Sequence, residues 1–115
     1  MEFKTRQSER KDTLNLVDYI VLSKSGQPLN RGMARTLNIS ELGILLETHL
    51  RFEIGQELLL TIGLKNNLFE FKGKIAHAET KDNDVFAYGV EFIEMCDEGL
   101  IILREFLKTF KENHA

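Results

Sequence analysis

Residue types and runs that mark several protein classes are scarce or missing in this sequence. It has a single cysteine, Cys96, in 115 residues, so no internal disulfide can form and a reducing compartment is expected. No apolar run approaches the roughly 20 residues that a membrane-spanning helix needs. The N-terminal Met-Glu-Phe-Lys-Thr-Arg lacks the apolar core of a secretory signal. We therefore expect a cytoplasmic protein without membrane insertion.

Residue patterns typical of catalysis and of metal binding are missing as well. No Gly-x-Ser-x-Gly, phosphate-binding-loop or dinucleotide-binding fingerprint occurs, and no nucleophile–base pair or paired carboxylates are apparent. His49, His77 and His114 lack metal-ligand spacing, and Cys96 has no Cys or His close by in the sequence. We expect no enzyme, no metal site and no cofactor.

The net charge of -3 argues against bulk attraction to DNA, RNA or anionic lipid. The positive charge is nevertheless concentrated in two short segments. Residues 1–11 hold four cations against two acids, and residues 24–36 hold Lys24, Arg31 and Arg35 with no acid. A small anionic ligand held between these segments would account for the pattern; a chance fluctuation of surface charge is the alternative.

Hydrophobic patterning predicts a mostly β domain. Residues 69–75 and 86–92 alternate between apolar and polar with period two, as strands with one buried face do. Residues 15–22 are rich in β-branched and aromatic side chains, which favour strands. Three further strands are expected, with turns or loops between the strands; the strands cover 33–40, 44–48 and 57–62, and the connections lie at 25–28, Gly43, Gly55 and 80–84.

The two ends of the chain differ from this pattern. Leu100, Leu103, Leu107 and Phe110 repeat at helical spacing, which predicts a helix with Asp97 as its N-cap. Residues 1–13 are polar and without apolar periodicity, which predicts a flexible N-terminal arm before a domain that spans 14–115. Closely spaced strands followed by one amphipathic helix favour a barrel or a sandwich with a C-terminal helix.

The predicted strand 33–40 presents polar side chains on one face. Because alternate residues share a face, Leu37 and Ile39 would point into the core, and Thr36, Asn38 and Ser40 would point outward. The same parity places Arg35 on the side of Leu37, away from Asn38, unless a β-bulge intervenes.

Residues 38–43 permit two interpretations. Asn38 and Ser40 can each donate and accept hydrogen bonds, as pairing with a base edge requires. Gly43 has no Cβ and lets a flat ligand approach the backbone. The alternative is a simple turn, since Asn, Ser and Gly are all turn formers.

Arg6 and Arg10 lie on the predicted arm. Each guanidinium presents a planar fork that fits a phosphate or the O6/N7 edge of guanine at two points. Four extended residues span up to roughly 13 Å, so one arginine can reach a phosphate while the other reaches a base. A solvated basic tail is the alternative.

The two motifs together resemble the signature of the PilZ family. That signature is Arg-x-x-x-Arg followed, one strand later, by Asp/Asn-x-Ser-x-x-Gly; here Arg6-x-x-x-Arg10 is followed after 27 residues by Asn38-x-Ser40-x-x-Gly43. Nearly the whole chain takes part in the resemblance, through the stretches Thr36–Thr48, Gly55–Leu58, Tyr88–Phe92 and the closing helix.

The resemblance implies a six-stranded antiparallel β-barrel with a C-terminal α-helix. It also implies a bacterial receptor for the second messenger cyclic di-GMP, whose arm changes conformation on binding and which signals to a downstream protein. The ligand-binding residues that it implies are Arg6, Arg10, Asn38, Ser40 and Gly43. Arg35 and Lys11 are second-tier candidates.

Two other functions remain open. The first is a PilZ-like protein-interaction module that does not bind nucleotide, and the second is a small enzyme such as a hydrolase. The complete Arg and Asn/Ser/Gly sets argue against the first, and the lack of a catalytic constellation argues against the second.

Overall fold

The computed structural model describes residues 16–64, 66–82 and 84–114. These residues form six strands and one helix: β1 (Leu16–Leu22), β2 (Pro28–Ile39), β3 (Gly43–Thr48), β4 (Glu57–Leu64), β5 (Asn67–Asp82), β6 (Val85–Met95) and α2 (Asp97–His114). The predicted arm, with Arg6, Arg10 and Lys11, lies outside the described residues.

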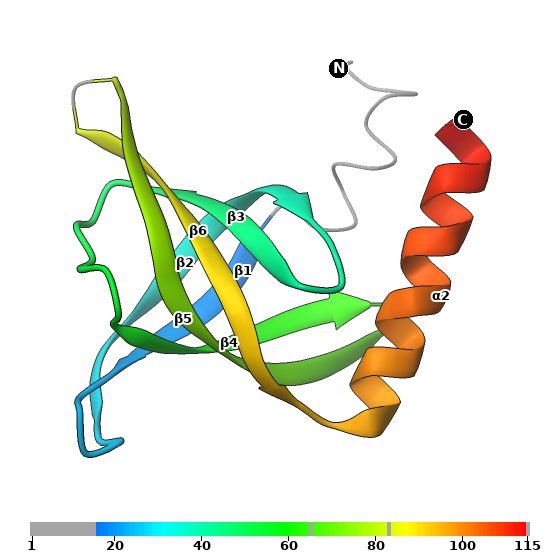
Figure 1. Ribbon diagram of the computed structural model, residues 1–115, viewed down its shortest axis with the longest axis horizontal. Coiled ribbons are helices and arrows are strands. Elements are labelled where there is room, and N and C mark those ends of the chain that lie inside the picture. Colours follow the sequence, from blue (N-terminus) through cyan, green and yellow to red (C-terminus); the bar gives the residue numbers. More distant parts are fainter. Residues whose placement is uncertain (1–15, 65, 83, 115) are drawn as a thin grey trace.

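The strands close into a barrel in the order β1-β2-β3-β6-β5-β4, and β4 pairs back with β1. Every neighbouring pair is antiparallel. Figure 1 shows α2 standing beside the barrel, near the point where β4 ends and β5 begins. The prediction of a six-stranded antiparallel barrel with a C-terminal helix is confirmed.

Alternation of buried and less buried side chains fills the barrel, and it is strict along β1, β3 and β4. In β4, Leu58, Leu60, Ile62 and Leu64 are fully buried, and the residues between them are half-exposed. Period-two patterning does this because successive side chains point to opposite faces of a strand. Each such aliphatic side chain stabilises the fold by about 1.5–3 kcal/mol through burial. Leu103 of α2 joins the same core, so the helix is anchored to the barrel by its apolar face.

The loop after β3 covers another part of the barrel interior. The Phe52 ring lies 5.2 Å from that of Tyr19 and 5.0 Å from that of Tyr88. The Tyr88 hydroxyl accepts a hydrogen bond from the Phe52 amide at 2.9 Å and donates one to the Leu50 carbonyl at 3.3 Å. Buried tyrosine hydroxyls need such partners, and here they fix the path of the loop.

The β5–β6 hairpin extends further than the sequence predicts. The expected loop at 80–84 is largely strand, since Thr80 pairs with Phe86 and Asp82 with Val85. Residues 76–81 are exposed, and Figure 1 shows this hairpin projecting beyond the barrel. Backbone hydrogen bonds can hold two paired strands together even where neither face of the pair is buried. Polar side chains therefore do not end β5 here.

The helix begins one residue earlier than predicted. The Leu100 amide donates to the Cys96 carbonyl at 3.0 Å, and the Gly99 amide donates to Cys96 Sγ at 3.2 Å. Cys96 is therefore the N-cap, and the prediction of Asp97 is wrong by one position. Asp97 lies in the first turn instead, where a carboxylate stabilises the helix by its interaction with the helix dipole. No helix among the described residues is both long and apolar enough to cross a bilayer.

Candidate functional site

A β-bulge near the end of β2 decides which side chains face outward. The register shifts between Thr36 and Asn38, which leaves Leu37 without a partner residue on β3. Thr36 pairs with the buried Leu46 and therefore points inward; its hydroxyl is buried without a hydrogen-bond partner among the described residues. The prediction that Thr36 points outward is wrong because a bulge adds one residue and reverses the parity before it.

The other predictions of inward or outward orientation for this strand are partly confirmed and partly wrong. Ile39 packs against the core as expected, and Asn38 is exposed. Leu37 is half-buried and lies outside the core cluster, so its prediction as a core residue is wrong.

The bulge also places Arg35 on the outer face, together with Asn38. Arg35 pairs with Glu47 across β3, and its Nη1 lies 3.3 Å from Glu47 Oε1. Glu47 is also 3.4 Å from Lys81 Nζ through its other oxygen. Arg35 therefore shares a face of β2 with Asn38, but its guanidinium is already paired with a carboxylate.

The residues between β2 and β3 form a turn that the Ser40 side chain organises. The Ser40 amide donates to the Gly43 carbonyl at 2.9 Å, and Ser40 Oγ accepts from the amides of Leu42 and Gly43 at 3.2 and 3.3 Å. The turn interpretation of residues 38–43 is thus correct as a description of local structure. It leaves the polar surface intact, because Asn38 and Ser40 are both exposed.

Two long-range contacts hold this turn in place. Arg104 Nε of α2 donates to Glu41 Oε1 at 3.0 Å, and the Phe92 amide of β6 donates to the Leu42 carbonyl at 2.9 Å. Sequence reasoning missed the Glu41–Arg104 pair, because no local pattern relates two residues 63 positions apart.

Gly43 is a glycine because β6 passes close to it. A Cβ at this position would overlap the backbone oxygen of Val90. Among the described glycines, positive φ angles occur at Gly26 and Gly55 and not at Gly43. The missing side chain thus serves close strand packing, and a left-handed backbone is not the reason for it.

Asn38, Ser40 and Gly43 lie together at a shallow hollow on the outer wall of the barrel. The hollow has a volume of about 340 Å³. Its lining comes from four strands and the turn: residues 38–40, residues 42–45, Ala76 and residues 89–91. The structure thus brings together the three site residues predicted on the barrel.

The charge of this hollow is unusual for an anion site. Among the described residues that line it, Glu91 alone carries a charge. An anionic ligand therefore needs cations from outside the described lining. The sequence offers Arg6 and Arg10, which lie outside the described residues, and Arg35, which is paired with Glu47.

The described residues thus form a small closed barrel with an exposed polar turn beside a shallow hollow. The family model of the PilZ domain matches residues 4–109, nearly the whole chain, and the chain belongs to the PilZ domain family. PilZ domains are binding and effector modules, and the family is known for binding cyclic di-GMP. A search of curated proteins found no significant match.

Proposed function

We propose that this protein is a cytoplasmic bacterial receptor for cyclic di-GMP and that it acts on a downstream protein without catalysing a reaction. One observation carries the proposal: Asn38, Ser40 and Gly43 line one exposed hollow on a PilZ barrel. The exposed free thiol of Cys96 fits a reducing compartment.

The barrel side of the hollow offers hydrogen bonds and apolar surface. Ser40 Oγ uses its acceptor sites on two backbone amides, and its own proton faces the Gly43 carbonyl at a long 3.4 Å. A hydroxyl in this state gains by donating to a better acceptor, such as a phosphate oxygen or guanine O6. Leu42 is 79% exposed and offers an apolar surface to the face of a base.

The charge that the ligand needs would come from the arm. Cyclic di-GMP carries two phosphodiester charges, whereas the described lining contributes only the carboxylate of Glu91. Arg6 and Arg10 would supply two-point, charge-assisted hydrogen bonds to phosphate and guanine. Binding would then order the arm over the hollow, and the altered surface is what a partner protein would recognise.

A calorimetric titration with cyclic di-GMP tests the proposal. We expect saturable binding by the wild type. Arg6→Ala and Arg10→Ala should each weaken it by about 1.5–3 kcal/mol, the range for hydrogen bonds to charged groups, with little change in the thermal midpoint of unfolding.

Arg31→Ala is the matched control for charge, because Arg31 is exposed on β2 and does not line the hollow. It should bind as the wild type does. A wild-type protein that fails to bind would favour the nucleotide-independent interaction module. Arginine variants with wild-type affinity would show that the arm assignment is wrong.

A further inference from the structure

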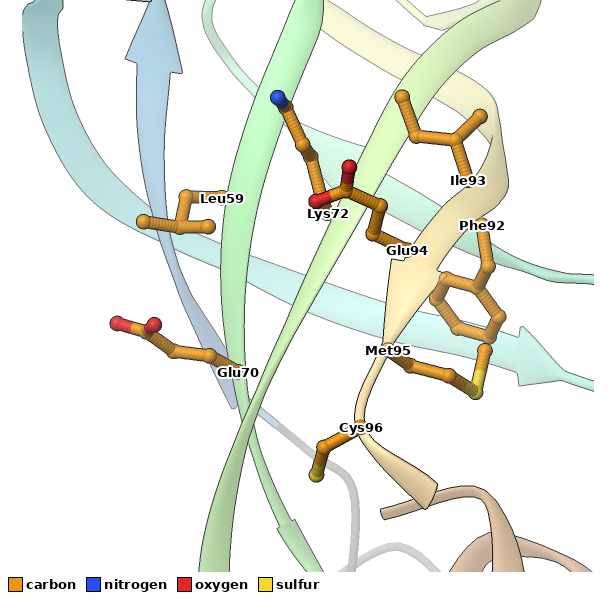
Figure 2. A pocket seen from close by; sticks show the side chains of 8 residues that line it. All are labelled: Leu59, Glu70, Lys72, Phe92, Ile93, Glu94, Met95 and Cys96. Atoms are coloured by element: carbon orange, nitrogen blue, oxygen red, sulfur yellow. The ribbon is translucent and has the colours of Figure 1, made fainter.

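A second, larger hollow lies on the outer surface of β4, β5 and β6, beside the start of α2. We call it the Ile93 groove. Its volume is about 650 Å³, roughly twice that of the hollow at Asn38. Figure 2 shows Leu59 and Glu70 along one side and Ile93, Met95 and Cys96 along the other, with Lys72 and Glu94 between them. Phe92 completes the lining.

A second β-bulge creates the exposed apolar wall of this groove. Lys72 pairs with Glu94 and the next residue, Gly73, pairs with Phe92, so Ile93 is the additional residue on β6. Phe92 turns inward, where its ring lies 5.1 Å from that of Phe71. Ile93 and Glu94 are both exposed, and Ile93 is 43% accessible. A bulge redirects side chains in this way, and here it leaves a β-branched aliphatic on the surface.

The charged groups of the groove are not balanced. Lys72 Nζ lies 3.5 Å from Glu57 Oε1 and is therefore already paired. Glu70 and Glu94 are exposed and have no hydrogen bond or ion pair within the described residues. The groove thus combines an apolar wall with two unpaired carboxylates. This combination repels phosphates and acidic peptides and attracts basic groups.

We propose that the Ile93 groove binds a short segment of a partner protein that carries a bulky aliphatic side chain flanked by lysine or arginine. The aliphatic side chain packs on Ile93 and Met95, on the side of the groove opposite Leu59. The flanking cations pair with Glu94, which lies between the two sides, and with Glu70 on the side of Leu59. Apolar contact combined with charge complementarity is common at such interfaces, and the charge complementarity selects the partner.

The test uses isotope-labelled full-length protein, a synthetic peptide of alternating leucine and lysine, and NMR amide shifts. We expect saturable shifts at Leu59, Lys72 and residues 93–96, and none at residues 38–43. A leucine–glutamate peptide of equal length should shift none of these amides. The measurement needs no cyclic di-GMP, so its result is independent of the proposed receptor function.

Variants separate the apolar contribution from the charged one. The double variant Glu70→Gln and Glu94→Gln should weaken binding of the leucine–lysine peptide about three- to tenfold, as the loss of two exposed ion pairs predicts. Ile93→Ser should weaken binding of the leucine–lysine peptide more than the double glutamine variant does. Leu29→Ser is the control, since Leu29 is 57% exposed and lies outside the groove; it should bind the peptide as the wild type does.

Three outcomes would overturn the proposal. The first is equal binding of the glutamate peptide, because charge complementarity would then play no part. The second is that the double glutamine variant binds the lysine peptide unchanged. The third is that the amides of residues 93–96 shift with protein concentration alone, which would assign the groove to a second copy of this chain.

Discussion

Ser40 and Gly43 belong to the same motif but do different things in the fold. Gly43→Ala places a Cβ against the backbone oxygen of Val90, and backbone cannot move aside as a flexible side chain does. We expect a loss of about 1–3 kcal/mol in the free energy of unfolding, typical of overpacking. Urea denaturation measures this loss.

Ser40→Ala is the cleaner test of ligand binding at this hollow. It removes the acceptor for two amides in an exposed turn, where water can replace the hydroxyl. The cost in stability should be about 0.5–1.5 kcal/mol, and the protein should stay folded while cyclic di-GMP binds more weakly. An unfolded Ser40→Ala protein, or a Gly43→Ala protein as stable as the wild type, would contradict this division of roles.

Tyr19 makes the stability of the barrel depend on pH in the alkaline range. Burial raises the pKa of its phenol above 10.0, and a hydrogen bond with Thr48 acts in the opposite direction with a smaller effect. The folded protein therefore holds the phenol proton more tightly than the unfolded chain does. Its contribution to stability is complete below about pH 10 and is lost as the pH rises through the raised folded pKa.

The variant Tyr19→Phe separates this effect from other alkaline titrations. We expect it to be less stable than the wild type at neutral pH, because the hydrogen bond between Tyr19 and Thr48 is lost, but to have a shallower decline of the free energy of unfolding above pH 10. Denaturant titrations at several pH values measure both. An identical decline in the two proteins would show that Tyr19 does not contribute to it.

At the level of whole elements, the sequence predicts best where one face is buried. Residues 69–75 and 86–92 are strands as expected, because their alternation matches a barrel wall with a filled interior. The spacing of leucines in α2 predicts the helix for the same reason, since Leu103 lies in the core. Ends of elements depend on backbone hydrogen bonds, so β5 continues to Asp82 through polar residues.

β-Bulges limit how well the alternation of residues along a strand predicts which side chains point outward. The bulge at Leu37 reverses the orientation of everything before it on β2, so Thr36 is buried and Arg35 is outward, while Asn38 remains as expected. No residue pattern shows where such an insertion falls, because it depends on the partner strand. The motif predicts that Asn38, Ser40 and Gly43 lie together on the barrel, as they do. The outward orientation of Arg35 and the Glu41–Arg104 pair required the fold.

The charge of the whole molecule sets how salt should affect ligand binding. The protein carries a net charge of -3, and the described lining of the hollow adds the carboxylate of Glu91. If the proposed receptor function holds, a dianionic ligand meets an unfavourable electrostatic potential there, and Arg6 and Arg10 would have to hold it against that potential. Because salt screens exposed charges over about 10 Å at 0.1 M, we expect the dissociation constant for cyclic di-GMP to rise with ionic strength. Titrations at low and high salt measure it, and a constant value would indicate binding dominated by stacking.

One strand, β6, borders both hollows. Residues 89–91 line the hollow at Asn38, and residues 92–96 line the Ile93 groove. If both proposals hold, a dianion in the first makes the potential at the second more negative and favours a basic segment there. Binding free energies are state functions, so this coupling is reciprocal: the factor by which the messenger tightens binding of the partner is also the factor by which the partner tightens binding of the messenger. A cell rich in the partner would then respond at a lower messenger concentration than a cell without it.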